Sequence, residues 1–159
     1  MLRASEIIDT PAPADDSLTL PFELRQKSRL VARSDAGRQI LLQLPRGGVL
    51  RHGALLRLSD GSLLEVRAAS ESLSAVESSN PVELLRAAYH LGNRHVALQI
   101  EPQGLRYLHD HVLDDMLVGL GLTPRALHAP FEPEHGAYGP SAAHQAHGPH
   151  DHEHDHDHG

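Results

Sequence analysis

The sequence contains no cysteine. Disulfide bonds, thiolate metal sites and cysteine nucleophiles are therefore excluded. The sequence also has no apolar run that approaches the roughly 20 residues a membrane-spanning helix needs. The first six residues, Met-Leu-Arg-Ala-Ser-Glu, lack the apolar core of a secretory signal. We therefore expect a cytoplasmic protein that has no membrane partner.

Positive charge is scarce as well. The chain has 14 Lys and Arg residues against 21 Asp and Glu residues, which gives a formal net charge of -7. Binding to a phosphate backbone needs a basic face, so we expect no nucleic-acid partner. Residues 25–29 (RQKSR) form a local basic cluster that could dock an acidic peptide. Such a cluster is more often a solvated loop.

Residues 1–71 have the pattern of a small all-β domain. The short apolar runs are separated by turn signals, which is typical of a small barrel or sandwich. The runs lie at residues 18–20, 29–32, 39–42 and 54–58. Asp60-Gly61 suits a two-residue hairpin loop, and it predicts a hairpin that joins Leu58 to Leu63.

Residues 72–132 predict a second domain with both helices and strands. The order is strand, helix, strand, strand, helix, strand, which is the ferredoxin-like β-α-β-β-α-β pattern. The predicted segments are 73–77, 81–91, 96–100, 105–108, a helix that starts at Asp110 or His111, and 125–131. The fold class is therefore α+β. Each unit has only about 60 residues and is marginal alone, so we expect association between the units or between two chains.

The first predicted helix has clear start and stop signals. Asn80 can cap its start, Pro81 suits the first helical position, and Glu83 completes a capping box. Gly92-Asn93 is a pair that ends helices in a left-handed turn. His95 is therefore predicted to lie on a short exit loop before the next strand.

The following hairpin indicates where three histidines lie. If the two strands pair with Ile100 opposite Leu105, His95 shares one end of the sheet with His109 and His111. The two histidine-bearing loops would then meet at one edge. His109 and His111 are candidate metal ligands, although a His-x-His pair before a helix is equally typical of an ordinary surface loop.

Residues 133–159 differ in composition from the rest of the chain, and we predict a disordered, His-rich, metal-binding tail. A free imidazole has a reference pKa of about 6.5, so near pH 7 it is mostly neutral and can donate a lone pair. Unorganised imidazoles should bind several ions weakly. Without thiolates, imidazole and carboxylate favour Ni(II), Zn(II) or Cu(II). The candidate ligands in the tail are His144, His147, His150, His152, His154, His156 and His158.

A single imidazole at His95 is a poor metal site by itself. A twofold dimer would bring two copies of His95 together, because such an interface places identical patches against each other. Tail histidines could fill the remaining coordination positions. His90 lies within the predicted helix and is more often packed than ligating, and His52 and His128 carry no further signal.

Two sequence motifs, HLGNRH at residues 90–95 and DHVLDDM at residues 110–116, resemble the signature of the urease accessory protein UreE family of nickel metallochaperones. The first unit is similar to the family's peptide-binding domain and the second to its metal-binding domain. The resemblance implies a homodimer with His95 of each chain on nickel and accessory binding at His109 and His111. It also implies nickel delivery to urease apoprotein through the other urease accessory proteins, including their GTPase.

We therefore expect a nickel carrier without catalysis. One alternative is metal storage or buffering by the tail alone. A less favoured alternative is a small metal-dependent hydrolase that uses His95, His109 and His111, because catalytic zinc typically takes three protein ligands and one water. Asp110 is then the only nearby candidate base, and the sequence has no nucleophile motif.

Overall fold

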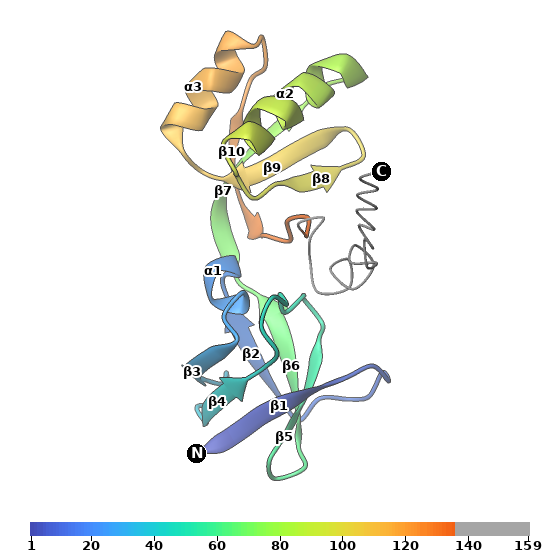
Figure 1. Ribbon diagram of the computed structural model, residues 1–159, viewed down its shortest axis with the longest axis vertical. Helices are drawn as coiled ribbons and strands as arrows, with labels where there is room; N and C mark the ends of the chain where they lie inside the picture. The colour runs from blue at the N-terminus through green and yellow to red at the C-terminus, as the bar shows by residue number, and fades with distance from the viewer. Residues whose placement is uncertain (136–159) are drawn as a thin grey trace, which may run out of the picture.

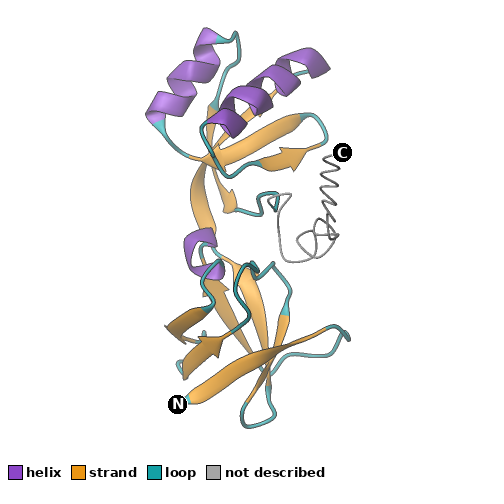
Figure 2. Cartoon of the chain, in the orientation of Figure 1, coloured by secondary structure: helices purple, strands orange, loops and turns teal. Residues whose placement is uncertain are grey.

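The computed structural model of the protein describes residues 1–135, which form two β-sheets joined by one continuous passage of chain (Figures 1 and 2). The first sheet has six strands and the second has four. Helices pack only on the second sheet, apart from a single turn in the first unit. The predicted α+β class is confirmed. The predicted disordered tail lies outside the described residues from residue 136 onward.

The N-terminal unit is the six-stranded sheet, in the order β2-β6-β5-β1-β4-β3. Its core consists of buried aliphatic side chains such as Leu18, Ile40 and Leu56. The sequence prediction included β2 to β5 as apolar runs and β6 as the second strand of the Asp60-Gly61 hairpin, and it omitted β1 and the one-turn helix α1. The elements are β1 (Leu2–Ile8), β2 (Asp16–Leu20), α1 (Phe22–Arg25), β3 (Arg29–Arg33), β4 (Gln39–Gln43), β5 (Leu55–Leu58) and β6 (Leu63–Ala68).

The predicted hairpin between β5 and β6 is present, but its loop is one residue longer than expected. Arg57 pairs with Leu63, and the Leu58 N–H donates to the Ser62 carbonyl at 2.9 Å. Gly61 has φ +86°. The loop is thus a turn closed by a left-handed glycine, which is the usual three-residue solution. The Asp-Gly pair marked the hairpin correctly, but it did not specify the register.

The C-terminal unit is the four-stranded sheet in the order β10-β7-β9-β8, and its neighbouring strands are all antiparallel. In chain order this is the 4-1-3-2 arrangement of a ferredoxin-like fold, as predicted. Figure 1 shows both long helices on the side of the sheet away from the N-terminal unit. The elements are β7 (Ser70–Glu77), α2 (Pro81–Asn93), β8 (Gln99–Glu101), β9 (Gly104–Leu108), α3 (His111–Gly119) and β10 (Arg125–Pro130).

The core of the C-terminal unit lies between the helices and one face of the sheet. Leu91 of α2 and Leu117 of α3 pack there against strand residues such as Leu105 and Tyr107. Strand β9 passes very close to β7, since a Cβ on Gly104 would lie 2.6 Å from the Val76 carbonyl oxygen. Only glycine fits this position without movement of the backbone.

The predicted hairpin register is confirmed, because Ile100 pairs with Leu105. The strand itself is shorter than predicted and begins at Gln99 rather than at Val96. The preceding segment pairs elsewhere. The Leu98 carbonyl accepts a hydrogen bond from the Glu134 N–H at 2.8 Å, so this segment contacts a part of the chain far along the sequence.

Helix α2 begins as predicted, but its capping box does not form. The Asn80 side chain accepts from the Val82 N–H at 3.1 Å. Glu83 does not reach back to the cap residue. Its carboxylate instead accepts from the Ser78 hydroxyl at 2.6 Å, and the Ser78 oxygen accepts from the Asn80 N–H at 3.0 Å. Ser78 therefore mediates the contact that a capping box makes directly.

The two units meet at a joint built around Arg25. Strand β6 ends at Ala68 and β7 begins at Ser70, so one residue separates the sheets. The Phe22 ring packs edge-on against Phe131, with ring centroids 5.5 Å apart. Beside them Arg25 is fully buried. The joint is therefore apolar with one charged group inside it.

Every hydrogen bond of the Arg25 guanidinium goes to a segment remote in sequence or to a strand end. Nε donates to the Leu20 carbonyl at 3.1 Å, and Nη1 donates to the Leu50 carbonyl at 3.1 Å. Nη1 also donates to the Glu132 carboxylate at 2.5 Å, and Nη2 donates to the Phe131 carbonyl. Burial lowers the pKa of Arg25, and Glu132 acts in the opposite direction.

The basic cluster at residues 25–29 is therefore not a single exposed surface. Arg25 points into the joint, whereas Lys27 and Arg29 are exposed. Neither the peptide-docking interpretation nor the solvated-loop interpretation describes Arg25. In the described residues, no helix is long and apolar enough to cross a membrane.

We predict that Arg25→Met destabilises the protein by about 3 kcal/mol, because it leaves Glu132 and several carbonyls at the joint without their donor. Urea denaturation of the purified protein measures this loss. Lys27→Met is the matched control, since Lys27 is exposed on the same segment. Equal effects of the two substitutions would show that the joint does not depend on the guanidinium.

Candidate metal centre

Helix α2 ends in a turn that places His95. The Val96 N–H donates to the Leu91 carbonyl at 3.3 Å, and the His95 N–H donates to the Gly92 carbonyl at 3.0 Å. These two bonds form a Schellman motif, in which the residue after the cap is left-handed. That residue is His95, with φ +57°. The prediction that Gly92-Asn93 makes the left-handed turn is therefore wrong, since the helix continues through Asn93.

His95 is the only residue other than glycine with positive φ in the described part of the chain. A side chain in this region costs roughly 1–2 kcal/mol, which is why glycine is usual there. Such strain is found most often at functional sites, where a particular side chain is required. The exposed imidazole of His95 is therefore a strong candidate for a functional group.

His95 lies on the wall of an open hollow of about 590 Å³ at the junction of the two units. Phe22 and Val49 contribute apolar wall from the N-terminal unit. Glu134 and His135, the last two described residues, line the same hollow. The described part of the chain therefore ends beside the candidate ligand.

The segment that ends at His135 is held in place by the other parts of the chain. The Glu132 N–H donates to the Gln99 side chain at 2.8 Å. Arg51 donates through Nη1 to the Pro133 carbonyl at 2.5 Å and through Nε to Nε2 of His135 at 3.1 Å. Spacing alone gives no signal for Glu134 or His135, because they are distant from His95 in the sequence and only the fold brings them together.

His109 and His111 lie at the start of α3, and both are exposed. The predicted helix start is confirmed, with Asp110 as its cap: the carboxylate accepts from the N–H groups of Val112 at 2.8 Å and Leu113 at 3.2 Å. The Nδ1 atom of His109 lies 3.0 Å from the Ser74 hydroxyl and 3.3 Å from the Asp114 carboxylate.

The structure does not bring the three predicted histidines into one group. Among residues 1–135, no three side chains of His, Asp or Glu lie close enough together to hold a metal ion. His95 lines the junction hollow, whereas His109 contacts β7 and α3. The three-ligand site of the hydrolase alternative is therefore not assembled within the described part of one protomer.

The Ser74, His109 and Asp114 side chains do not form a catalytic triad either. In a triad, the serine and the carboxylate bind opposite nitrogens of the imidazole. Here both face Nδ1. Ser74 is also buried, with 1 % of its surface exposed. This geometry does not produce an activated nucleophile.

The other described histidines have structural surroundings. The His90 ring packs edge-on against Tyr89. Nδ1 of His52 accepts from the Ala68 N–H at 3.1 Å, a contact that its sequence position did not indicate. His128 is exposed on β10. The remaining candidates lie outside the described residues: His144, His147, His150, His152, His154, His156 and His158.

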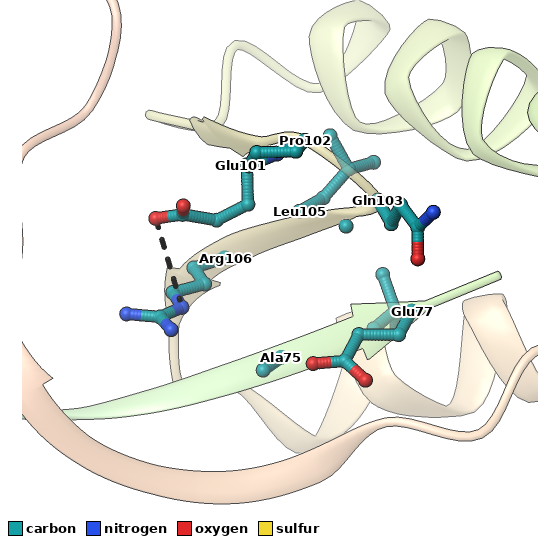
Figure 3. Close-up of a pocket in the computed structure, with 9 residues that line it drawn as sticks. Ala75, Glu77, Glu101, Pro102, Gln103, Leu105 and Arg106 are labelled. Atoms are coloured by element: carbon teal, nitrogen blue, oxygen red, sulfur yellow. Dashed lines mark ion pairs between the residues drawn. The ribbon is translucent and has the colours of Figure 1, made fainter.

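A second hollow, of about 290 Å³, lies beside the β8–β9 turn (Figure 3). It is lined by Glu77, Glu101 and Arg106, and Nε of Arg106 is 3.9 Å from the Glu101 carboxylate. None of the candidate histidines lines it. The turn is at the end of the hairpin opposite to the ends that lead to His95 and His109.

The described site thus offers exposed imidazoles on rigid supports. Such groups suit borderline divalent ions, because each neutral ring donates one lone pair. Fold and site together define a class: a small β unit joined to a ferredoxin-like unit that presents histidine side chains at its surface.

Comparison with known proteins identifies the family within this class. The model for the N-terminal domain of the UreE urease accessory protein matches residues 2–69, and the model for its C-terminal domain matches residues 71–158. The chain belongs to the UreE urease accessory protein family. This membership gives the chain a role in urease maturation.

Relatives match over most of their length. The chain is 55 % identical over 139 residues to the urease accessory protein UreE of Alkalilimnicola ehrlichii. The matched region covers 87 % of this chain and 85 % of the relative. It is 58 % identical over 123 residues to UreE of Pseudomonas putida strain GB-1, covering 77 % and 74 %. It is 49 % identical over 151 residues to UreE of Citrobacter koseri, covering 94 % and 97 %.

We predict that, at position 95, glycine is more stable than alanine by about 1 kcal/mol, because only glycine adopts the left-handed conformation without a steric cost. Urea denaturation of the metal-free His95→Gly and His95→Ala variants measures the difference.

The same pair of substitutions at Arg94 is the control, because its φ is −93°. There glycine should be the less stable residue, by roughly 0.5–1 kcal/mol. If alanine equals or exceeds glycine at both positions, the left-handed turn at His95 carries no strain.

Proposed function

We propose that the chain is a carrier of Ni(II) for urease metallocentre assembly and that it does no catalysis itself. Two protomers form a homodimer, and the His95 side chain of each donates to one shared nickel ion. His109 and His111 form an accessory site, and the tail histidines supply further ligands. Nickel is the cargo of this protein, so its site must both bind and release the ion.

The observation that carries the proposal is the conformation of His95. The chain has an imidazole at a left-handed position where glycine would have a lower conformational free energy. Two backbone hydrogen bonds hold this residue at the surface. One imidazole is a single ligand, and a twofold axis beside His95 would supply an identical second one. A site completed from two chains stays open enough to exchange its ion, whereas closed four-ligand sites hold metal structurally.

An apolar stripe on α2 supports the homodimer. Val82, Leu85 and Tyr89 lie on one face of the helix and are 55 %, 69 % and 66 % exposed. Contiguous exposed apolar side chains of this size indicate an interaction surface. The helix that carries this stripe ends at Asn93, two residues before His95. A second copy that covers the stripe with its own α2 running in the same direction would place its His95 near the first.

The position of the segment that leads into the tail supports transfer of a nickel ion between the tail and His95. His135 lies on the same hollow as His95, and the segment before it is fixed by Arg25, Arg51 and Gln99. Tail histidines tethered at this point have a high local concentration at the candidate site. Ligand chemistry also permits Zn(II) and Cu(II), and the proposal selects nickel because the chain belongs to a urease accessory family.

The remaining parts of the proposal concern domains, partners and location. We propose residues 1–71 as a peptide-binding-like domain, residues 72–132 as the metal-binding domain, and residues 133–159 as the metal-binding tail. The partners are urease apoprotein and the other urease accessory proteins, including their GTPase. The cytoplasmic location expected from the sequence stays a prediction.

We predict more than one nickel ion per dimer in the full-length protein. Deletion of residues 144–158 should lower that number and leave one tight site. His95→Ala should weaken the tight site by more than the roughly 10- to 100-fold that the loss of an outer-shell partner costs. Isothermal titration of Ni(II) and Zn(II), with molecular mass measured in parallel, gives all of these quantities.

His128→Ala is the control for this experiment, because it removes another exposed histidine from the same unit. If tail deletion abolishes all binding, the protein is a store that uses its tail alone. If the tight site survives His95→Ala, its position is wrong. A protein that stays monomeric when saturated with nickel contradicts the shared site.

We also predict that Leu85→Asp converts the dimer to a monomer, because it places a charge in the centre of the apolar stripe. Folding should change by no more than about 0.5 kcal/mol, since the residue is exposed in the protomer. Sedimentation reports the mass, and nickel titration should show weaker binding at the tight site. Val118→Asp, an exposed apolar residue on α3, should leave the mass unchanged.

A further inference from the structure

Four polar side chains meet where β7, β9 and α3 come together. Ser74 and Tyr107 are buried, with 1 % and 0 % of their surface exposed. The side chain of Asp114 is 23 % exposed, and that of His109 is 46 % exposed. The cluster therefore runs from the core to the surface, and it ends at an imidazole that solvent can reach.

The fold fixes each member of this cluster. Ser74 and Tyr107 are paired residues of β7 and β9. The His109 N–H donates to the Ser72 carbonyl at 3.0 Å, which attaches the backbone of His109 to β7. Asp114 is in the first turn of α3, whose start is fixed by the Asp110 cap.

The Asp114 carboxylate connects the buried and exposed ends of the cluster. The Tyr107 hydroxyl donates to one carboxylate oxygen at 2.5 Å. The other oxygen lies 3.3 Å from Nδ1 of His109. Burial, and then the contact with Asp114, raise the pKa of Tyr107 well above its ordinary range. Tyr107 therefore stays a donor at neutral pH and holds the carboxylate in place.

The position of the carboxylate selects one tautomer of the neutral imidazole. An ionised carboxylate only accepts hydrogen bonds, and it repels a lone pair. A proton on Nδ1 is therefore favoured. The Ser74 hydroxyl oxygen, 3.0 Å from Nδ1, can also accept a hydrogen bond from this N–H. The lone pair is then on Nε2. A carboxylate on the far nitrogen is the usual outer-shell partner of a metal-binding histidine.

We propose that Asp114, held by Tyr107, is a positioning residue that fixes His109 as the Nδ1–H tautomer and so presents Nε2 to a divalent cation. This inference rests on the proposed role of His109 as an accessory nickel ligand. It goes further by assigning the residues that orient the ring. It also separates His109 from His111, because only His109 has this support among the contacts of the described residues.

The test compares Asp114→Asn with Asp115→Asn in the full-length protein. Asp115 is exposed on the same helix, so both variants remove one charge from α3. Two-bond proton–nitrogen spectra of the histidine side chains, recorded without metal at about pH 8 where free imidazole is neutral, report the tautomer of His109. Paramagnetic broadening of the same signal, with free Ni(II) set by a chelator buffer, reports occupancy.

In Asp114→Asn, we expect His109 to shift toward the Nε2–H tautomer and the free Ni(II) needed for half-broadening to rise about 10- to 100-fold. Asp115→Asn should change neither quantity. Tyr107→Phe, which keeps the ring and the carboxylate, should shift both in the same direction by less. This second variant keeps the test valid if Asp114→Asn folds poorly, which the amide spectrum shows.

Two results overturn the inference: an unchanged tautomer in Asp114→Asn and Tyr107→Phe, or an equal loss of nickel affinity in Asp115→Asn. The second result would show that nickel affinity depends on the net charge of α3 and not on the position of the carboxylate. Failure of the proposed function would give a different result from failure of this inference. In that case nickel does not broaden the His109 signal of the wild-type protein, and the tautomer still depends on Asp114.

Discussion

The geometry of this protein depends on one buried guanidinium. Arg25 binds the end of β2, the segment at Leu50, and the Phe131–Glu132 segment that follows the last strand. Each of the two units is small enough to be marginal alone. Because the hollow at His95 has walls from both units, its shape follows from this joint, and so does the point at which the chain leaves toward the tail.

The two candidate ligand positions are held by different means. Backbone hydrogen bonds of a Schellman motif place His95, and their cost is a left-handed residue that is not glycine. Side chains place His109, through the carboxylate of Asp114 and the hydroxyl of Ser74. The first device fixes where the imidazole stands, and the second fixes which of its nitrogens is available.

Both devices suit the proposed nickel carrier, which must release the ion that it binds. In the proposed function, each presents one imidazole at the surface, and a second chain or the tail supplies the remaining ligands. A complete set of ligands on one rigid unit would hold the ion more tightly and exchange it more slowly. The fold therefore places single ligands precisely and does not enclose them.

The sequence by itself determined the order of elements in the C-terminal unit, the Asn80 cap, a helix start at Asp110 or His111, and the pairing of Ile100 with Leu105, because helix starts and hairpins depend on neighbours within a few residues. It did not determine the three-residue loop at Gly61 or the left-handed turn at His95, where backbone geometry decides between similar local patterns. The burial of Arg25, the approach of His135 to His95, and the meeting of Ser74 with His109 were decided by tertiary structure alone. These contacts join residues tens of positions apart, and they exist only after the sheets and the two units have packed together.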